Sequence, residues 1–137
     1  MSEAFRIASG GRIDRSRQLS FRFDGRRMTG RAGDTLASAL LANGVHLVGR
    51  SFKYHRPRGI LAAGAEEPNA LVGVDRGPGR YAPNLRATQV ELHEGLSAES
   101  QNRFPSLRLD LAALANLAAD LLYAFLNPKI RYGRGVA

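Results

Sequence analysis

The residues best suited to contact another molecule are five basic or titratable side chains within nine positions of the stretch GRSFKYHRPRG. They are Arg50, Lys53, His55, Arg56 and Arg58. Pro57 fixes its own φ and favours an extended conformation at Arg56, so the guanidinium groups on either side of it can grip carboxylates or phosphates in a bidentate manner. The pattern predicts a rigid basic loop that contacts an acidic protein surface or a cofactor phosphate.

The same loop allows other interpretations. Phe52 and Tyr54 alternate with Lys53 and His55, so the two rings could stack on the bases of a nucleic acid. Alternation could instead place both rings in the core and the charges outside, or the segment could be a solvated basic loop. The net charge of +8 and the pI near 11.0 favour an anionic partner. Charge does not choose among partners, but the proline-braced arginines favour a subunit or cofactor contact over nucleic acid.

The chain lacks the residues that most catalytic sites and metal sites require. The chain has no cysteine, which excludes disulfides, thiolate zinc sites, a cysteine nucleophile and an iron–sulfur cluster held by four thiolates. His46, His55 and His93 lack metal-ligand spacing, and the adjacent Glu66 and Glu67 would point apart. No glycine-rich nucleotide fingerprint or Walker lysine occurs. We therefore expect no catalytic residue, no metal and no cofactor bound by this chain alone.

A β-hairpin is predicted at the start of the folded domain. Leu19, Phe21 and Phe23 alternate with polar residues, which is the period of a half-buried strand. The Asp-Gly pair that follows is a hairpin turn signal, and residues 26–31 can return as the second strand.

A short helix follows the hairpin. Asp34 is predicted as its N-cap, apolar residues recur at helical spacing over residues 36–43, and Gly44 suits a left-handed C-terminal position. Three later segments complete the prediction: a strand over residues 70–75, a turn over residues 76–84 and a strand over residues 87–95. A hairpin that leads directly into a short helix predicts an α+β chain of the ubiquitin-like β-grasp class.

The chain divides into three predicted parts. Residues 1–17 form a basic extended arm, residues 18–96 the β-grasp domain, and residues 97–137 a linker and a carboxy-terminal amphipathic helix. The helix covers residues 106–126 and ends at Asn127-Pro128; its apolar stripe is expected to pack back on the chain's own sheet rather than against another domain. No signal-peptide core and no apolar run of about 20 residues is present, so we expect a soluble cytoplasmic protein without a membrane contact.

Four stretches carry a family resemblance: GRIDR, FRFDG, GDTLASALLANGVHLVGRSFKYHRPRGILAAGAEEPNALV and NLRATQVEL. Together, over about residues 11–105, they resemble the amino-terminal region of the α subunit of heterotetrameric sarcosine oxidase. The resemblance implies a following dinucleotide-binding domain that holds NAD, a folate-related carboxy-terminal domain, and partner β, γ and δ subunits. It also implies FAD and FMN in the complex, which demethylates sarcosine to glycine and forms hydrogen peroxide and methylene-tetrahydrofolate.

Related amine-oxidising and cyanide-forming oxidoreductases resemble plant-type [2Fe–2S] ferredoxins in this domain, with a C-x4-C-x2-C loop and a fourth cysteine. The resemblance places those four ligand positions at Ala62, Glu67, Ala70 and Thr88. Alanine has no donor atom, and one carboxylate plus one hydroxyl cannot replace four soft thiolates. The resemblance therefore implies a ferredoxin-like scaffold without its cluster.

The leading hypothesis is a non-catalytic structural or assembly domain of a sarcosine oxidase α subunit, inactive by itself, whose basic loop contacts the rest of α or the β subunit. The alternative is a stand-alone basic protein-interaction adaptor or a nucleic-acid-binding module. Residue 137 precedes any dinucleotide fingerprint, so we expect an excised domain in preference to a split gene product.

Overall fold

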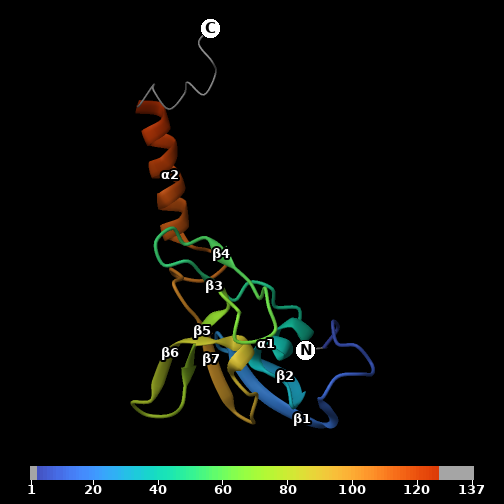
Figure 1. Cartoon of the computed structure of the whole chain (residues 1–137). Coiled ribbons are helices and arrows are strands. Elements are labelled where there is room, and N and C mark those ends of the chain that lie inside the picture. The colour runs from blue at the N-terminus through green and yellow to red at the C-terminus, as the bar shows by residue number, and fades with distance from the viewer. Residues whose placement is uncertain (1–2, 127–137) are drawn as a thin grey trace.

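A computed structural model of the chain describes residues 3–126 (Figure 1). The elements, in chain order, are β1 (Asp14–Phe23), β2 (Arg26–Ala32), α1 (Leu36–Ala42), β3 (Gly49–Arg50), β4 (Pro57–Arg58), β5 (Leu71–Asp75), β6 (Tyr81–Arg86), a 3₁₀ turn (Ala87–Gln89), β7 (Leu96–Ser100) and α2 (Leu111–Leu126). The predicted helix stop at Asn127-Pro128 and the basic tail that follows it lie outside the described residues.

Five strands form one mixed sheet in the order β2-β1-β7-β5-β6. The central pair, β1 and β7, is parallel, and the other neighbouring strands are antiparallel. A parallel central pair flanked by antiparallel hairpins, with α1 packed on the sheet, is the β-grasp arrangement, so the predicted α+β class is confirmed. The two short strands β3 and β4 form a separate ribbon between this sheet and α2 (Figure 1).

The β1–β2 hairpin forms as its sequence predicts. Phe21 and Phe23 point into the core, and the turn residues Asp24 and Gly25 have φ of 50° and 79°, which a two-residue type I′ turn requires. The Asp24 carboxylate also accepts hydrogen bonds from the backbone N–H of Ser100, at 2.7 Å, and from its hydroxyl, at 2.6 Å. The turn is thereby tied to the end of β7, the strand parallel to β1.

Helix α1 begins one residue later than predicted. Thr35, not Asp34, is the N-cap: its hydroxyl accepts from the Ser38 N–H at 3.1 Å, and the Ser38 hydroxyl accepts from the Thr35 N–H at 3.0 Å. Asp34 is buried and forms an ion pair with Arg6 instead, with an N–O distance of 2.6 Å. Gly44 has the expected left-handed conformation, with φ of +78°.

The second half of the sheet differs from the prediction. The predicted strand over residues 87–95 is a 3₁₀ turn followed by irregular chain, and β6 begins within the predicted turn over residues 76–84 and extends beyond it to Arg86. β7 completes the sheet at Leu96–Ser100, where alternate side chains are buried. The sheet therefore continues past residue 96, the predicted end of the domain.

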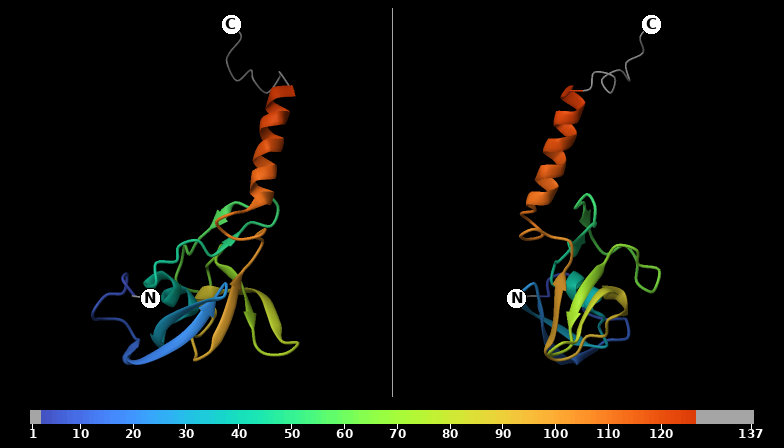
Figure 2. Two further views of the ribbon diagram at one scale, coloured as in Figure 1. Left: turned by 180° about the vertical axis from the view of Figure 1, so that it is seen from behind. Right: turned by 90° about the vertical axis from the view of Figure 1, so that its left-hand side faces the viewer.

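Helix α2 projects away from the sheet in every view (Figures 1 and 2). None of its residues is buried, and the leucines on its stripe are about half exposed or more, from Leu111 at 47% to Leu121 at 64%. The prediction that this stripe packs back on the chain's own sheet is wrong. Within residues 3–126, no helix is both long enough and apolar enough to cross a bilayer.

The core lies between α1 and the inner face of the sheet. It contains large side chains that are fully buried: Phe21, Met28, Leu36, Leu40, Val48, Val72, Val74 and Leu96. Except for Val48, which directly precedes β3, these residues come from α1 and from strands β1, β2, β5 and β7, so their burial holds the whole domain together.

Leu40 and its neighbour Leu41 provide a test of this core. We expect Leu40→Ala to lower the free energy of unfolding by about 2–5 kcal/mol, because Leu40 is 0% exposed and its removal leaves a cavity. Leu41→Ala, at a side chain that is 36% exposed, should cost less than about 1 kcal/mol. Urea unfolding measures both, and equal losses would contradict the placement of α1.

Candidate functional site

The loop that joins β4 to β5 closes around the carboxylate of Glu67, whose side chain is fully buried. One oxygen, Oε2, accepts the backbone N–H groups of Leu61 at 2.7 Å and Ala62 at 2.5 Å. The other oxygen, Oε1, accepts those of Asn69 at 3.0 Å and Ala70 at 3.3 Å. A single side chain thus draws together both ends of the loop.

The surroundings of Glu67 favour its charged form. Burial acts to raise the pKa of its carboxyl, but the hydrogen bonds from Ala62, Asn69, Leu61 and Ala70 outweigh that effect. The pKa therefore lies below the ordinary value of 4.5, and the group is an anion at neutral pH. Peptide N–H groups compensate this buried charge.

The loop is also fastened from outside. The hydroxyl of Thr88 donates to the carbonyl of Gly64 at 2.7 Å, and Arg86 Nε donates to the carbonyl of Glu67 at 3.1 Å. Thr88 is buried in the 3₁₀ turn, and Arg86 ends β6. The four positions predicted for cluster ligands, at residues 62, 67, 70 and 88, consequently converge on one small region.

Two of the five predicted contact residues, Arg50 and His55, face their own chain. Arg50 Nε donates to the carbonyl of Leu107 at 2.9 Å, and Nη1 donates to the carbonyl of His55 at 2.7 Å. Both side chains also approach Asp110 Oδ2, at 3.6 Å from Arg50 Nε and 3.1 Å from His55 Nδ1. The basic loop is thus fixed to the segment that leads into α2.

Asp110 is the organising residue of that junction, and it was not predicted from the sequence. It is buried, and its carboxylate accepts the N–H groups of Phe104 at 2.9 Å and Ala113 at 2.7 Å. Burial acts to raise the pKa of Asp110, but the bonds from Ala113, His55 and Phe104 hold it below its usual range. An aspartate directly before an apolar helical repeat is an N-cap signal that could have identified it.

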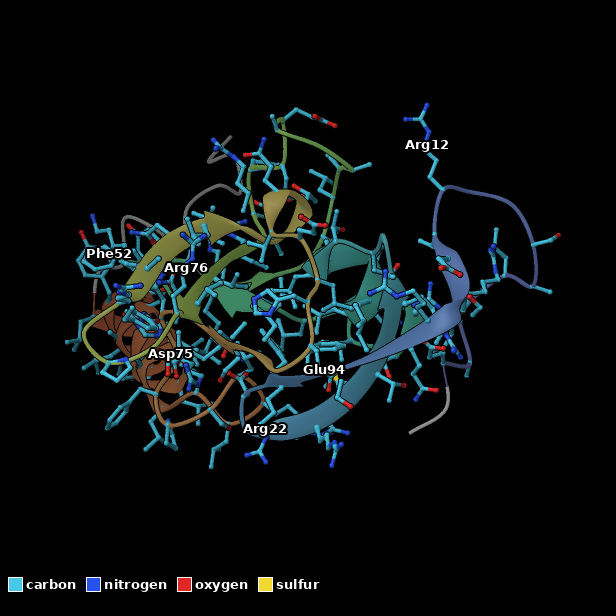
Figure 3. All side chains as sticks on the ribbon, turned by 90° about the horizontal axis from the view of Figure 1, so that it is seen from below. Arg12, Arg22, Phe52, Asp75, Arg76 and Glu94 are labelled. Carbon is cyan, nitrogen blue, oxygen red and sulfur yellow. The ribbon has the colours of Figure 1, made fainter. Side chains whose placement is uncertain are left out.

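Two of the remaining contact residues, Lys53 and Arg56, face outward together with two aromatic rings. Phe52 is 85% exposed and Tyr54 is 48% exposed, so the interpretation that buried both rings is wrong. Lys53 Nζ lies 5.4 Å and Arg56 Cζ 5.3 Å from the centroid of the Tyr54 ring, within cation–π range. Figure 3 shows Phe52 at the edge of the molecule. Arg58 is half-buried and lines a cleft beside the loop.

The exposed part of this loop lies next to α2. Asn116 Nδ2, in the first half of the helix, donates to the carbonyl of Lys53 at 3.5 Å. The rings of Phe52 and Tyr54, the charges of Lys53 and Arg56 and the apolar stripe of α2 therefore gather at one end of the domain.

The predicted basic arm docks on the domain itself. Arg6 pairs with Glu3 at 2.9 Å and with the buried Asp34 at 2.6 Å, and Arg31 pairs with Glu3 at 2.9 Å. Burial acts to raise the pKa of Asp34, but its bonds with Arg6, the Arg31 N–H and Ser38 lower it overall. The end of the predicted arm, from Asp14 on, is part of β1.

Comparison with known proteins places this geometry in a family. Residues 16–103 match the model of a 2Fe-2S iron-sulfur cluster binding domain. The chain belongs to this family. The matched range of the 2Fe-2S domain includes the hairpin, α1, the Glu67 loop and β7.

Curated relatives of this 2Fe-2S domain are much longer proteins. The chain is 64% identical over 121 residues to the sarcosine oxidase subunit alpha of Rhizobium meliloti (strain 1021), which covers 88% of the chain and 12% of that protein. It is 53% identical over 92 residues to the sarcosine oxidase subunit alpha of Corynebacterium sp. (strain P-1), covering 64% of the chain and 9% of that protein. The chain thus spans about a tenth of the length of these relatives.

A solved structure shows the same fold. The crystal structure of L-proline dehydrogenase from P. horikoshii matches with a TM-score of 0.52 and 24% identity, over 64% of this chain and 16% of that one. At this identity the likeness concerns the fold alone.

The residues of this 2Fe-2S family member do not fit a cluster. Ala62 and Ala70 contribute only backbone N–H groups, Thr88 uses its hydroxyl on Gly64, and Glu67 uses both carboxylate oxygens on the loop. Within residues 3–126, no three His, Cys, Asp or Glu side chains gather in a way that could hold a metal ion. Iron of a [2Fe–2S] cluster needs four thiolate or imidazole ligands, which this loop does not supply.

The low pKa of Glu67 predicts an acid-dependent stability. Because its folded-state pKa lies below the unfolded value of 4.5, its contribution is fully present above about pH 5 and is lost as the pH falls through the folded-state pKa. Glu67→Gln should lower the free energy of unfolding by about 1–3 kcal/mol near neutral pH. The gap to the wild type should shrink on acidification.

Urea unfolding of both proteins between about pH 7 and pH 3 measures this gap. Asp34 and Asp110 also have lowered pKa values, but both proteins retain them, so their effects cancel in the difference. A gap that stays constant or widens in acid would contradict the assignment of a charged Glu67.

Proposed function

We propose that this chain is a non-catalytic assembly domain of a sarcosine oxidase α subunit. Identities of 64% and 53% to two such subunits support the assignment, and the loop without cluster ligands supports a role other than electron transfer. In this proposal the cytoplasmic complex demethylates sarcosine to glycine with formation of hydrogen peroxide and methylene-tetrahydrofolate. NAD, FAD and FMN are held by later parts of α and by the β subunit, alongside γ and δ, and not by these residues.

The observation that carries the proposal is the exposed apolar stripe of α2. Leu114, Leu117, Leu121 and Phe125 are each between 54% and 69% exposed, although a stripe of this kind normally faces a core. Exposed apolar patches of this extent mark interaction sites. We assign the stripe to the surface on which later domains of the α subunit pack.

The outward part of the basic loop extends this surface. Lys53 and Arg56 are exposed, as is the Phe52 ring, and the carbonyl of Lys53 accepts a hydrogen bond from Asn116 of the helix. The surface fits an apolar groove with an acidic rim, on later domains of α or on β. The helix stripe would supply most of the affinity, because exposed ion pairs contribute only about 0–1 kcal/mol each.

The assembly role can be tested with two aspartate substitutions on the same helix. Leu121→Asp puts a charge in the middle of the stripe, whereas Ala119→Asp puts the same charge on an exposed position off the stripe. In the full-length α subunit co-expressed with its partners, we expect Leu121→Asp to reduce assembled complex and bound flavin by about tenfold or more, since losing an apolar anchor costs at least about 1.4 kcal/mol.

Ala119→Asp should leave assembly and flavin content near the wild-type level. Size-exclusion chromatography and flavin absorbance measure both quantities. Equal assembly of the two variants, or a coding sequence that does not continue into a dinucleotide-binding domain, would overturn the proposal.

A second candidate function is favoured by one observation, the exposed rings of Phe52 and Tyr54 among basic side chains. Rings on such a surface can stack on single-stranded bases. If this is the function, a generic oligonucleotide should bind with an affinity that falls steeply with salt and falls further in Phe52→Ala. An assembly domain should show no binding at physiological salt.

A further inference from the structure

We propose that the Glu67 carboxylate takes the structural place of the iron–sulfur cluster, as a built-in anion around which the β4–β5 loop folds. The loop is then an anion-binding nest whose bound anion is a side chain of the loop itself. This inference concerns the folding of the loop and is independent of the assembly role.

The first argument is the arrangement of the donors. Four backbone N–H groups converge on one buried carboxylate, two on each oxygen. Leu61 and Ala62 come from one end of the loop, and Asn69 and Ala70 come from the other. Such convergent peptide N–H groups form the concave nests that hold phosphates and iron–sulfur clusters.

The second argument is the identity of the positions. Of the four positions that the family resemblance assigns to cluster ligands, residue 67 supplies the anion, and residues 62 and 70 supply two of its donors. Residue 88 locks the loop through its hydroxyl bond to Gly64. The positions that would bind a cluster are therefore the ones that now bind or enclose the carboxylate.

The third argument is the charge. A cluster held by thiolates is a buried anion whose sulfur atoms accept hydrogen bonds from the surrounding loop. Without any anion, these N–H groups, which are buried or partly buried, would lose their shared acceptor, which destabilises the fold. The carboxylate meets the same electrostatic demand without iron.

The proposal predicts that acetate can replace the missing side chain. Glu67→Ala removes two carbons and two oxygens, which are the heavy atoms of acetate, so the variant should have a nest of matching size and charge. The 137-residue chain with Glu67→Ala should unfold at a lower urea concentration than the wild type. Acetate at about ten times its dissociation constant should raise its folded-to-unfolded ratio about tenfold, in a saturable manner.

The controls separate anion binding from general effects. Glu66→Ala removes the same atoms from an exposed neighbour and should neither destabilise the fold comparably nor respond to acetate. Acetamide, which has the shape of acetate without its charge, and sodium chloride at equal ionic strength should not restore Glu67→Ala. Restoration by acetate alone supports the proposal, whereas no restoration or equal restoration by acetamide overturns it.

Glu67→Gln decides the question if Glu67→Ala does not fold even in acetate. It keeps the shape of the side chain but replaces one acceptor oxygen with an amide donor that faces N–H groups. We expect it to unfold at a lower urea concentration than the wild type, with no response to acetate because its side chain fills the nest. A Glu67→Gln variant as stable as the wild type would overturn the proposal.

Discussion

The hydrogen bonding of one buried carboxylate, that of Glu67, determines how the middle of this chain can fold. Four peptide N–H groups point into the loop, and the backbone cannot satisfy them by itself because the loop has no strand partner there. The carboxylate satisfies all four and lies just before β5, so it also fixes where that strand enters the sheet. The path of the loop and the start of β5 are thus linked through one interaction, whereas the register of β5 comes from its pairing with β6 and β7.

A second buried carboxylate, that of Asp110, plays the corresponding part at the other end of the domain. It receives Arg50 and His55 from the basic loop and the backbone N–H of Ala113 in the first turn of α2. Because its two oxygens are committed to both segments, the helix starts beside the loop and is directed away from the sheet (Figure 2). The apolar stripe of α2 and the exposed rings of the loop are therefore presented together as one surface.

Local patterns in the sequence predict the first half of the fold well. The alternation around Phe21 and the Asp24-Gly25 turn specify the hairpin, and Gly44 marks the end of α1 correctly. β7 escapes prediction because only Leu96 and Ala98 mark it as apolar, and its place between β1 and β5 depends on long-range pairing. The direction of α2 could not be predicted for a related reason, because an apolar stripe on a helix does not indicate which surface packs against it.

The candidate site is predictable in position but not in chemistry. The family resemblance locates residues 62, 67, 70 and 88, yet nothing local in the sequence reveals that Glu67 turns inward while the adjacent Glu66 stays exposed.

The most direct test is an NMR titration that follows the carboxyl carbon of Glu67 and the amides of Leu61, Ala62, Asn69 and Ala70. A carboxylate nest predicts a Glu67 pKa below 4.5, with the four amides shifting at the same pH. A carboxyl that titrates at or above that value, or amides that do not follow it, would contradict the nest.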